Sequence, residues 1–181
     1  MAFKDKPFPL HYKFLCLHGI GTNSEIFQTQ LGALAAVDDL ADYVTENGPY
    51  DAVIGFSLGA ALIATLLLHT GKDNAIQQIR SAVFICGTLP CCPKELAIGR
   101  IRLLQAKDAT SVIKTPTLHL WSREDAEYPG QSEQLVQVCT KETRRVIMHG
   151  AGHNVPSRSN EAAEIAAAVV EVCSSSLTRG P

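Results

Sequence analysis

Short apolar runs with strand-like composition recur along the chain, and longer stretches with helical spacing separate them. This alternation is typical of an α/β fold, in which helices cover both faces of a mainly parallel sheet. We expect five strands, at residues 13–17, 52–56, 82–86, 117–121 and 145–148. The expected architecture is a three-layer sandwich.

The stretches between these strands predict at least four helices. The first is expected within residues 24–48, with Ser24 as its N-cap and Gly48 as its end, and the others at residues 58–69, 132–139 and about 160–173. Residues 89–115 show no clean period and are expected to form a cap or to line a pocket. Residues 174–181 are polar and are expected to be a disordered tail.

Length and composition fit one compact soluble domain over residues 1–181, with 46% apolar and 19% charged residues. A formal net charge of -2 provides no field that attracts nucleic acid or an anionic membrane, so neither is expected as a partner. No apolar run is long enough for a membrane span, and prolines and a histidine interrupt the N-terminal stretch where a signal peptide needs an apolar core. These features predict a cytoplasmic protein.

The six cysteines lack the paired spacing of a zinc site. Three lie inside apolar runs, where a reduced thiol behaves as a small hydrophobe, so we expect buried thiols, no metal and no cofactor. The adjacent Cys91 and Cys92 precede Pro93 in a loop, where they could be reactive or could line a pocket, and we favour the second.

The segment Gly55-Phe56-Ser57-Leu58-Gly59 joins an expected strand to an expected helix. A serine on this sharp turn is a candidate nucleophile, and glycines two residues before and after it remove side chains that would crowd the turn. The pattern alone is weak, since an ordinary serine can also stand where a strand meets a helix. The strand and helix on either side favour the nucleophile.

A serine nucleophile needs a base and an acid, in the chain order serine, acid, histidine. His153 follows the last expected strand and is the expected base, whereas His149 at the strand end is expected to be packed or on the surface. Asp125, after the preceding strand, is the expected acid. Glu124 and Glu127 are expected to be solvated loop charges.

Two backbone N–H groups are expected to form the oxyanion hole, that of Leu58 after the nucleophile and that of Ile20 in the loop after the first strand. Gly19 and Gly21 allow this loop to approach the substrate closely. We expect His18 to shape the loop through a local hydrogen bond and not to act as a base.

Four blocks of the chain resemble, in order, those of the FSH-type serine hydrolases, a branch of the α/β-hydrolase superfamily: "LCLHGIGTNSEIFQTQLGAL", "ENGPYDAVIGFSLGAAL", "PTLHLWSREDAEYP" and "GAGHNVPS". The resemblance implies Ser57 as nucleophile, Asp125 as acid and His153 as base. It also implies a carboxylic ester or thioester hydrolase, several relatives being encoded with fungal polyketide synthases. A polyketide or fatty-acyl chain, free or bound to a carrier protein, is the substrate class this implies.

The chain departs from this family near Val37 and Asp38, where several tens of residues with an edge strand and a substrate-lining loop are absent. We therefore expect residues 13–17 and 52–56 to form neighbouring strands. The connection between these strands then places one helix on one face of the sheet, where the family has helices on both faces. We expect apolar surface to be exposed on the other face, which favours oligomerisation or instability.

Three functions stay open at this point. The first is hydrolysis through an acyl-enzyme at Ser57. The second is a catalytically impaired short form or a non-hydrolytic binding protein on the same scaffold. Acyl transfer to an acceptor other than water uses the same residues as hydrolysis. The acyl chain, the leaving group and the oligomeric state are not set by the sequence.

Overall fold

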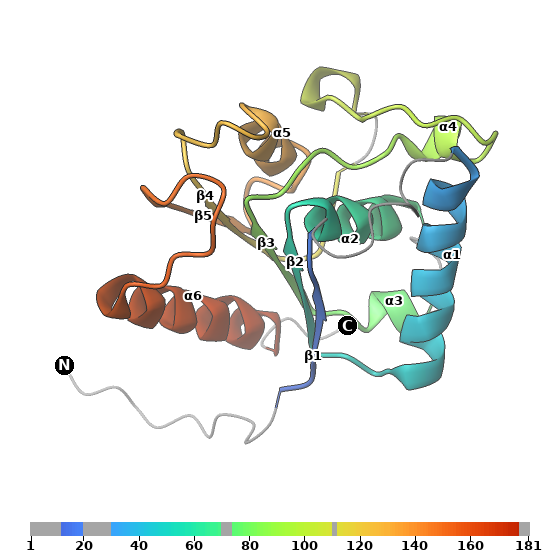
Figure 1. Cartoon of the computed structure of the whole chain (residues 1–181). Helices are drawn as coiled ribbons and strands as arrows, with labels where there is room; N and C mark the ends of the chain where they lie inside the picture. Colours follow the sequence, from blue (N-terminus) through green and yellow to red (C-terminus); the bar gives the residue numbers. More distant parts are fainter. Residues whose placement is uncertain (1–11, 20–29, 70–73, 110–111, 178–181) are drawn as a thin grey trace.

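A single parallel sheet of five strands runs through the computed structural model, which describes residues 12–19, 30–69, 74–109 and 112–177. In spatial order the strands are β1 (Phe14–Leu17), β2 (Ala52–Phe56), β3 (Ser81–Ile85), β4 (Thr117–Trp121) and β5 (Arg144–Met148) (Figure 1). All five expected strands are present, and no bound differs by more than one residue. The predicted α/β fold with a five-stranded parallel sheet is confirmed.

The helices are α1 (Gln30–Asn47), α2 (Leu58–His69), α3 (Asn74–Gln77), α4 (Pro93–Leu96), α5 (Gln131–Gln137) and α6 (Ser159–Leu177), with a 3₁₀ turn η2 (Ala106–Asp108). The expected cap Ser24 lies outside the described residues. The last helix continues to Leu177, so the start of the expected tail is helical, which corrects that prediction. The described part of residues 89–115 contains the short helix α4, the turn η2 and residues of two isolated bridges, in agreement with its lack of a period.

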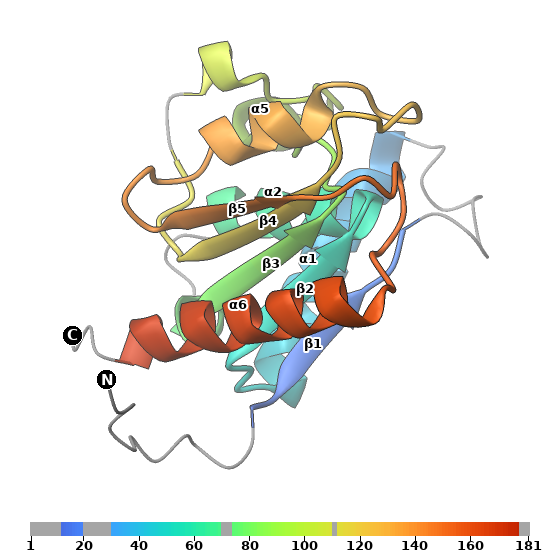
Figure 2. The ribbon, with the colours of Figure 1, turned by 90° about the vertical axis from the view of Figure 1, so that its left-hand side faces the viewer.

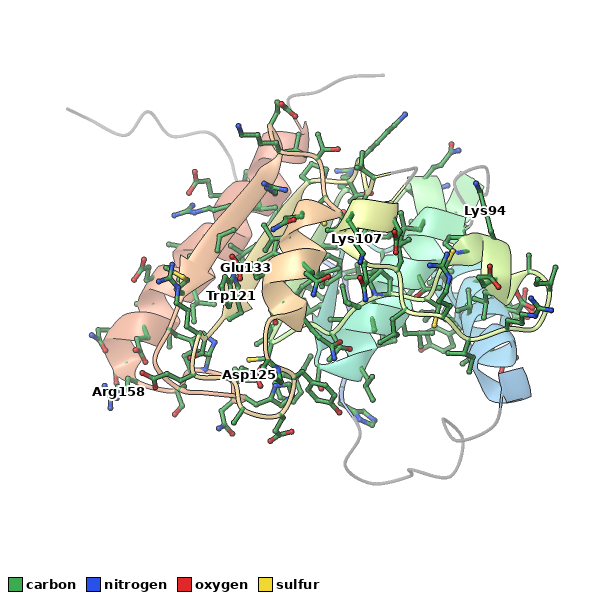
Figure 3. The ribbon with its side chains drawn as sticks, turned by 90° about the horizontal axis from the view of Figure 1, so that it is seen from above. Lys94, Lys107, Trp121, Asp125, Glu133 and Arg158 are labelled. Carbon is green, nitrogen blue, oxygen red and sulfur yellow. The ribbon has the colours of Figure 1, made fainter. Side chains whose placement is uncertain are left out.

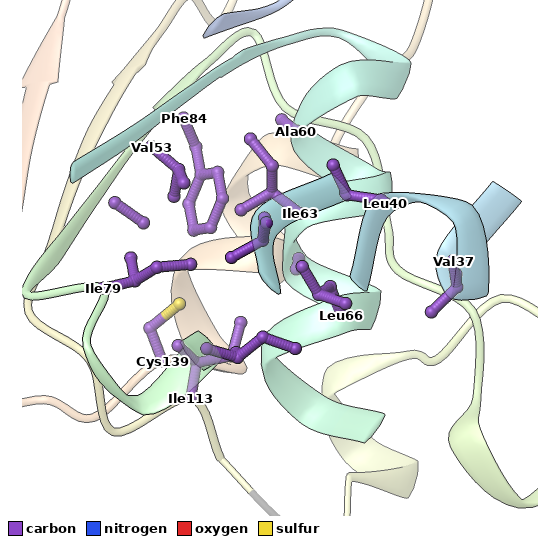
Figure 4. Close-up of a cluster of buried hydrophobic side chains, with 14 of the residues drawn as sticks. Val37, Leu40, Val53, Ala60, Ile63, Leu66, Ile79, Phe84, Ile113 and Cys139 are labelled. Atoms are coloured by element: carbon purple, nitrogen blue, oxygen red, sulfur yellow. The ribbon is translucent and has the colours of Figure 1, made fainter. Parts of the chain in front are cut away.

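Two apolar clusters hold the layers together, one on each face of the sheet. Helices α1, α2 and α3 lie on one face, where Phe84 of β3, Ile63 and Leu66 of α2, and Val37 and Leu40 of α1 belong to one buried apolar cluster (Figure 4). Helix α6 covers the opposite face (Figure 2), where its Ala168 and Val172 pack with β3 and β4. The apolar run of α2 is therefore explained by burial, since most of the residues in this helix are inaccessible.

The first two strands are neighbours, as the shortened sequence predicts. Phe14 pairs with Ala52, and Leu17 with Gly55, in parallel register. Helix α1 runs without a break through residues 37 and 38 and packs on the same face as α2. Leu15 and Leu17 of β1 pack against the core cluster and Cys16 is exposed, so this edge strand is partly covered, and the expected loss of cover on a whole face of the sheet stays a prediction.

The cysteines follow the expected pattern with one exception. Cys86, Cys92, Cys139 and Cys173 are buried, and no disulfide joins the cysteines of the described segments. Cys16 is exposed, which corrects the expectation of a buried thiol, because it lies on the edge strand β1, between Leu15 and Leu17, which pack against the core cluster. Among the described residues, no helix combines the length and apolarity that a membrane crossing requires.

Candidate active site

Ser57 stands between the last residue of β2 and the first residue of α2, with φ of 54°. A positive φ is uncommon for a residue with a side chain and marks a strained turn that presents a hydroxyl above the end of a strand. The N–H of Ser57 donates to the carbonyl of Ile85 at 2.9 Å, and its own carbonyl accepts from the N–H of Ala60 at 3.1 Å. Neighbouring elements thus fix the turn at the carboxyl edge of the sheet.

The glycines beside Ser57 are required by close packing. A Cβ at Gly55 would lie 2.6 Å from the Cα of Ala60, inside the first turn of α2. A Cβ at Gly59 would lie 2.5 Å from the carbonyl oxygen of Leu17, at the end of β1. Both distances are shorter than real contacts allow, so glycine at each position lets β1, β2 and α2 meet around Ser57.

Ser57, His153 and Asp125 form a continuous chain of hydrogen bonds. Nε2 of His153 lies 2.9 Å from Oγ of Ser57, and Nδ1 lies 2.7 Å from Oδ2 of Asp125. Because an ionised carboxylate only accepts hydrogen bonds, Nδ1–H donates to Asp125 and Nε2 is left to accept from the Ser57 hydroxyl. In this arrangement a serine can lose its proton as it attacks an acyl carbonyl.

Asp125 lies in the loop after β4 (Figure 3) and is fixed on both of its carboxylate oxygens. Oδ2 accepts from His153, and Oδ1 accepts from the N–H groups of Glu127 and Tyr128, each at 3.0 Å. Burial by itself raises the pKa of Asp125, but these hydrogen bonds and the nearby His153 outweigh it and hold the pKa below the ordinary value of 3.8. The carboxylate is therefore ionised and oriented at neutral pH.

The ring of His153 lies close to two aromatic side chains. Its centroid lies 5.2 Å from that of Phe56 and 5.1 Å from that of Tyr128. The preceding Gly152 has φ of 61°, which suits glycine and turns the chain so that the ring reaches over the sheet edge. Glu127 is exposed, as expected of a loop charge, but its Oε2 lies 3.9 Å from Nε2 of His153.

The proposed oxyanion hole is described in part. Leu58 is the first residue of α2, so its N–H belongs to the helix N-terminus, where backbone donors have no acceptor in a preceding turn. Ile20 lies outside the described residues. Nδ1 of His18 lies 2.6 Å from the carbonyl oxygen of Gly19, the local hydrogen bond expected for a histidine that shapes this loop.

Two residues that the sequence did not single out complete the surroundings of the site. Tyr128 contacts the ring of His153, and Cys86 places its Sγ 3.8 Å from Nε2 of His149. Cys86 ends the third expected strand, at the same edge of the sheet as Ser57, Asp125 and His153, and this position is the signal that could have identified it. His149 is packed, as expected, and not part of the chain of hydrogen bonds to Ser57.

Sγ of Cys86 and donor atoms of Asp125 and His153 lie within 4.8 Å of one another, a separation that could suit a metal ion. Burial and the charge of Asp125 raise the pKa of the Cys86 thiol to about 12, and Nδ1 of His153 already donates to Asp125. A metal needs a thiolate and free lone pairs, so these residues fit a hydrogen-bonded cluster better than a metal site.

Comparison with known proteins identifies the family. Residues 34–165 match the family described as serine hydrolase (FSH1). The chain belongs to the FSH1 serine hydrolase family. It is 28% identical over 209 residues to the esterase FPY3 of Fusarium mangiferae, in an alignment that covers 88% of this chain and 95% of that relative. It is 27% identical over 184 residues to the hydrolase phiM of a fungal species, which covers 79% and 86%.

Solved structures agree on the fold of this FSH1 serine hydrolase. The carboxylesterase from Mesorhizobium loti superposes with a TM-score of 0.59 at 18% identity, over 87% of this chain and 88% of that one. The alignment with FPY3 spans 209 residues but takes in 88% of the 181 residues here, about 159, so about 50 positions have no counterpart in this chain. This supports the expected shortening, and its location at residues 37 and 38 stays a prediction.

Proposed function

We propose that this member of the family hydrolyses carboxylic esters or thioesters through an acyl-enzyme at Ser57, with His153 as the base and Asp125 as the acid that orients it. The observation that carries the proposal is the unbroken relay from Oγ of Ser57 through both ring nitrogens of His153 to Asp125, with separations of 2.9 and 2.7 Å. Each contact lies within the distance required for proton transfer.

In the first half of the reaction, Oγ of Ser57 attacks the acyl carbonyl carbon while Nε2 of His153 takes the hydroxyl proton. The negative charge that develops on the carbonyl oxygen is stabilised by the N–H of Leu58 and, in the proposal, by that of Ile20. The ionised Asp125 stabilises the imidazolium. His153 then returns the proton to the departing alcohol or thiol, which leaves Ser57 acylated.

In the second half, water takes the place of the leaving group. Nε2 of His153 removes a proton from this water as it attacks the acyl carbonyl, and a second tetrahedral intermediate forms in the same oxyanion hole. The intermediate collapses, the bond to Oγ of Ser57 breaks, and His153 returns the proton to the serine. An acceptor other than water at this step would give acyl transfer instead.

The finer part of the proposal concerns the substrate, an acyl ester or thioester of polyketide or fatty-acyl type, free or bound to a carrier protein. Its support is the resemblance of the four sequence blocks and the fungal origin of the esterase FPY3 and the hydrolase phiM. Neither similarity defines the acyl chain.

Hydrolysis of a graded series of p-nitrophenyl esters and acyl thioesters tests the proposal. We expect turnover of at least one series by the wild type, and a loss of about 10³-fold or more in kcat for Ser57→Ala. A folded wild type without turnover in either series would contradict the proposal and favour the non-hydrolytic binding protein, an alternative that the partly exposed edge strand β1 motivates.

A further inference from the structure

Cys86 occupies a backbone position that a side chain disfavours. Its φ is 46°, and a value of this kind is uncommon for any residue except glycine. Its N–H donates to the carbonyl of Leu120 at 2.8 Å, so the turn after β3 is tied to β4. The side chain is completely buried. Glycine would remove the backbone strain at this position. The advantage of cysteine over glycine here is therefore the set of contacts that the thiol makes.

The thiol of Cys86 contacts the loop that carries His153 at three points. Sγ lies 3.6 Å from the carbonyl oxygens of both Gly152 and Asn154, the residues on either side of His153. It also lies 3.8 Å from Nε2 of His149, at the start of the same loop. One side chain from the turn after β3 thus holds both ends of the short segment that presents the base.

The directions of these hydrogen bonds are consistent with one another. The N–H of Ala151 donates to Nδ1 of His149 at 3.2 Å, so Nδ1 accepts and the ring proton resides on Nε2, which donates to Sγ of Cys86. The S–H of Cys86 is then available to the carbonyls of Gly152 and Asn154. Burial lowers the pKa of His149 and raises that of Cys86 to about 12, so both groups stay neutral at pH 7.

We propose that Cys86 is a positioning residue, whose buried thiol holds the loop of residues 149–154 so that His153 stays between Asp125 and Ser57. The inference rests on the proposed hydrolytic function. As a protonated and buried thiol, Cys86 does not act as a second nucleophile. Its loss displaces the base and leaves the acyl-binding surface in place.

The test compares Cys86→Ala, Cys86→Ser and a matched control, Cys139→Ala. Cys139 is also a buried cysteine whose Sγ donates to a backbone carbonyl, that of Leu135, but it precedes β5 and so lies at the opposite edge of the sheet. With a p-nitrophenyl ester, we expect Cys86→Ala to lower kcat by about 10- to 100-fold with KM within about twofold. Serine keeps a donor and should restore most of kcat, and Cys139→Ala should leave kcat within about twofold.

A readout that does not depend on turnover separates this inference from the proposed function. The proton on Nδ1 of His153, in its short hydrogen bond to Asp125, is followed as a far-downfield NMR signal that His153→Ala abolishes. We expect the signal in the wild type and in Cys86→Ser, and its loss or broadening in folded Cys86→Ala. An unchanged signal and kcat in Cys86→Ala would overturn the positioning role even if Ser57 is catalytic. If the wild type shows the signal but does not hydrolyse the ester, loss of the signal in Cys86→Ala would still support the positioning role.

Discussion

Nε2 of His153 lies 2.9 Å from Oγ of Ser57, although 96 residues separate the two in sequence. The strand-to-helix turn holds the serine, and the loop after β5 brings the histidine across the ends of three strands to meet it. Parallel strands place all their carboxyl ends at one edge, which is why residues from distant parts of the chain converge here. The shortened sequence leaves this edge intact.

Removal of the charge on Asp125 should disable the relay without unfolding the protein. In Asp125→Asn the amide oxygen accepts from the N–H groups of Glu127 and Tyr128, so the amide NH2 faces Nδ1 of His153 and donates to it. The ring proton then resides on Nε2, which can no longer accept from Ser57, and we expect kcat to fall by about 10³- to 10⁴-fold. The matched control is Glu124→Gln, since Glu124 is exposed and adjacent in sequence and should leave kcat within about twofold. Comparable losses in the two variants, measured with one ester, would contradict the role of Asp125.

His119 predicts how stability depends on pH. It is buried beside Phe84 and near Arg144, and burial is the main cause that lowers its pKa from 6.5 to about 3. Between these values the unfolded chain binds a proton that the folded chain does not, so the free energy of unfolding falls as the pH falls. The expected slope from this group is about 1.4 kcal/mol per pH unit below pH 6.

Denaturant unfolding of the wild type and of His119→Gln at several pH values measures this slope. Glutamine cannot take up a proton, so the variant should lose less stability than the wild type between pH 6 and pH 4, whatever its stability at pH 7.5. Above pH 7 the two curves should run parallel, because His119 is then neutral in both states. Parallel curves down to pH 4 would show that His119 titrates normally in the folded protein.

Gly59 should tolerate no side chain. A Cβ there would lie 2.5 Å from the carbonyl oxygen of Leu17 and 2.7 Å from that of His18. We expect Gly59→Ala to push α2 away from the end of β1, with a loss of about 1–3 kcal/mol in stability and at least about tenfold in kcat/KM. Gly150→Ala is the control near the site, since a Cβ at Gly150 meets no atom within 4 Å. Thermal unfolding and ester hydrolysis measure both effects. If Gly59→Ala has the stability and the kcat/KM of the wild type, the packing explanation is wrong.

Glu127 should disfavour substrates that carry a negative charge near the reacting carbonyl. Its carboxylate lies 3.9 Å from Nε2 of His153 and is largely exposed, so its field is felt at the site but screened by salt. We expect Glu127→Gln to raise kcat/KM for an ester with a terminal carboxylate by about 2- to 5-fold at low salt, with a neutral ester of equal length unchanged. A gain that persists at high salt would point to a cause other than charge.

Local chemistry made much of the site predictable from the sequence. The glycines around Ser57 identified the strand-to-helix turn. The chain order serine, acid, histidine then pointed to Asp125 and His153, which the structure places in contact. The choice of Asp125 over Glu124 and Glu127 has a physical basis that only the structure shows, because Asp125 is the buried member and accepts two backbone N–H groups.

Contacts between distant segments could not be predicted. Cys86 and Asn154 are 68 residues apart, and although its place at a strand end puts Cys86 near the site, nothing in the local pattern of either residue predicts that the thiol contacts this loop. The exposure of Cys16 depends in the same way on which elements cover β1. The pairing of β1 with β2 was predictable, because the segment between them is too short to contain the additional strand of the family and joins them directly.

The central claim, that Ser57 is an activated nucleophile, is tested most directly by covalent labelling with a fluorophosphonate probe, followed by mass mapping of the modified residue. We predict stoichiometric modification of the folded wild type at Ser57, no modification of Ser57→Ala, and slow modification of His153→Ala. Persistent labelling of Ser57→Ala at the wild-type rate, or a folded wild type that the probe does not modify, would contradict the claim.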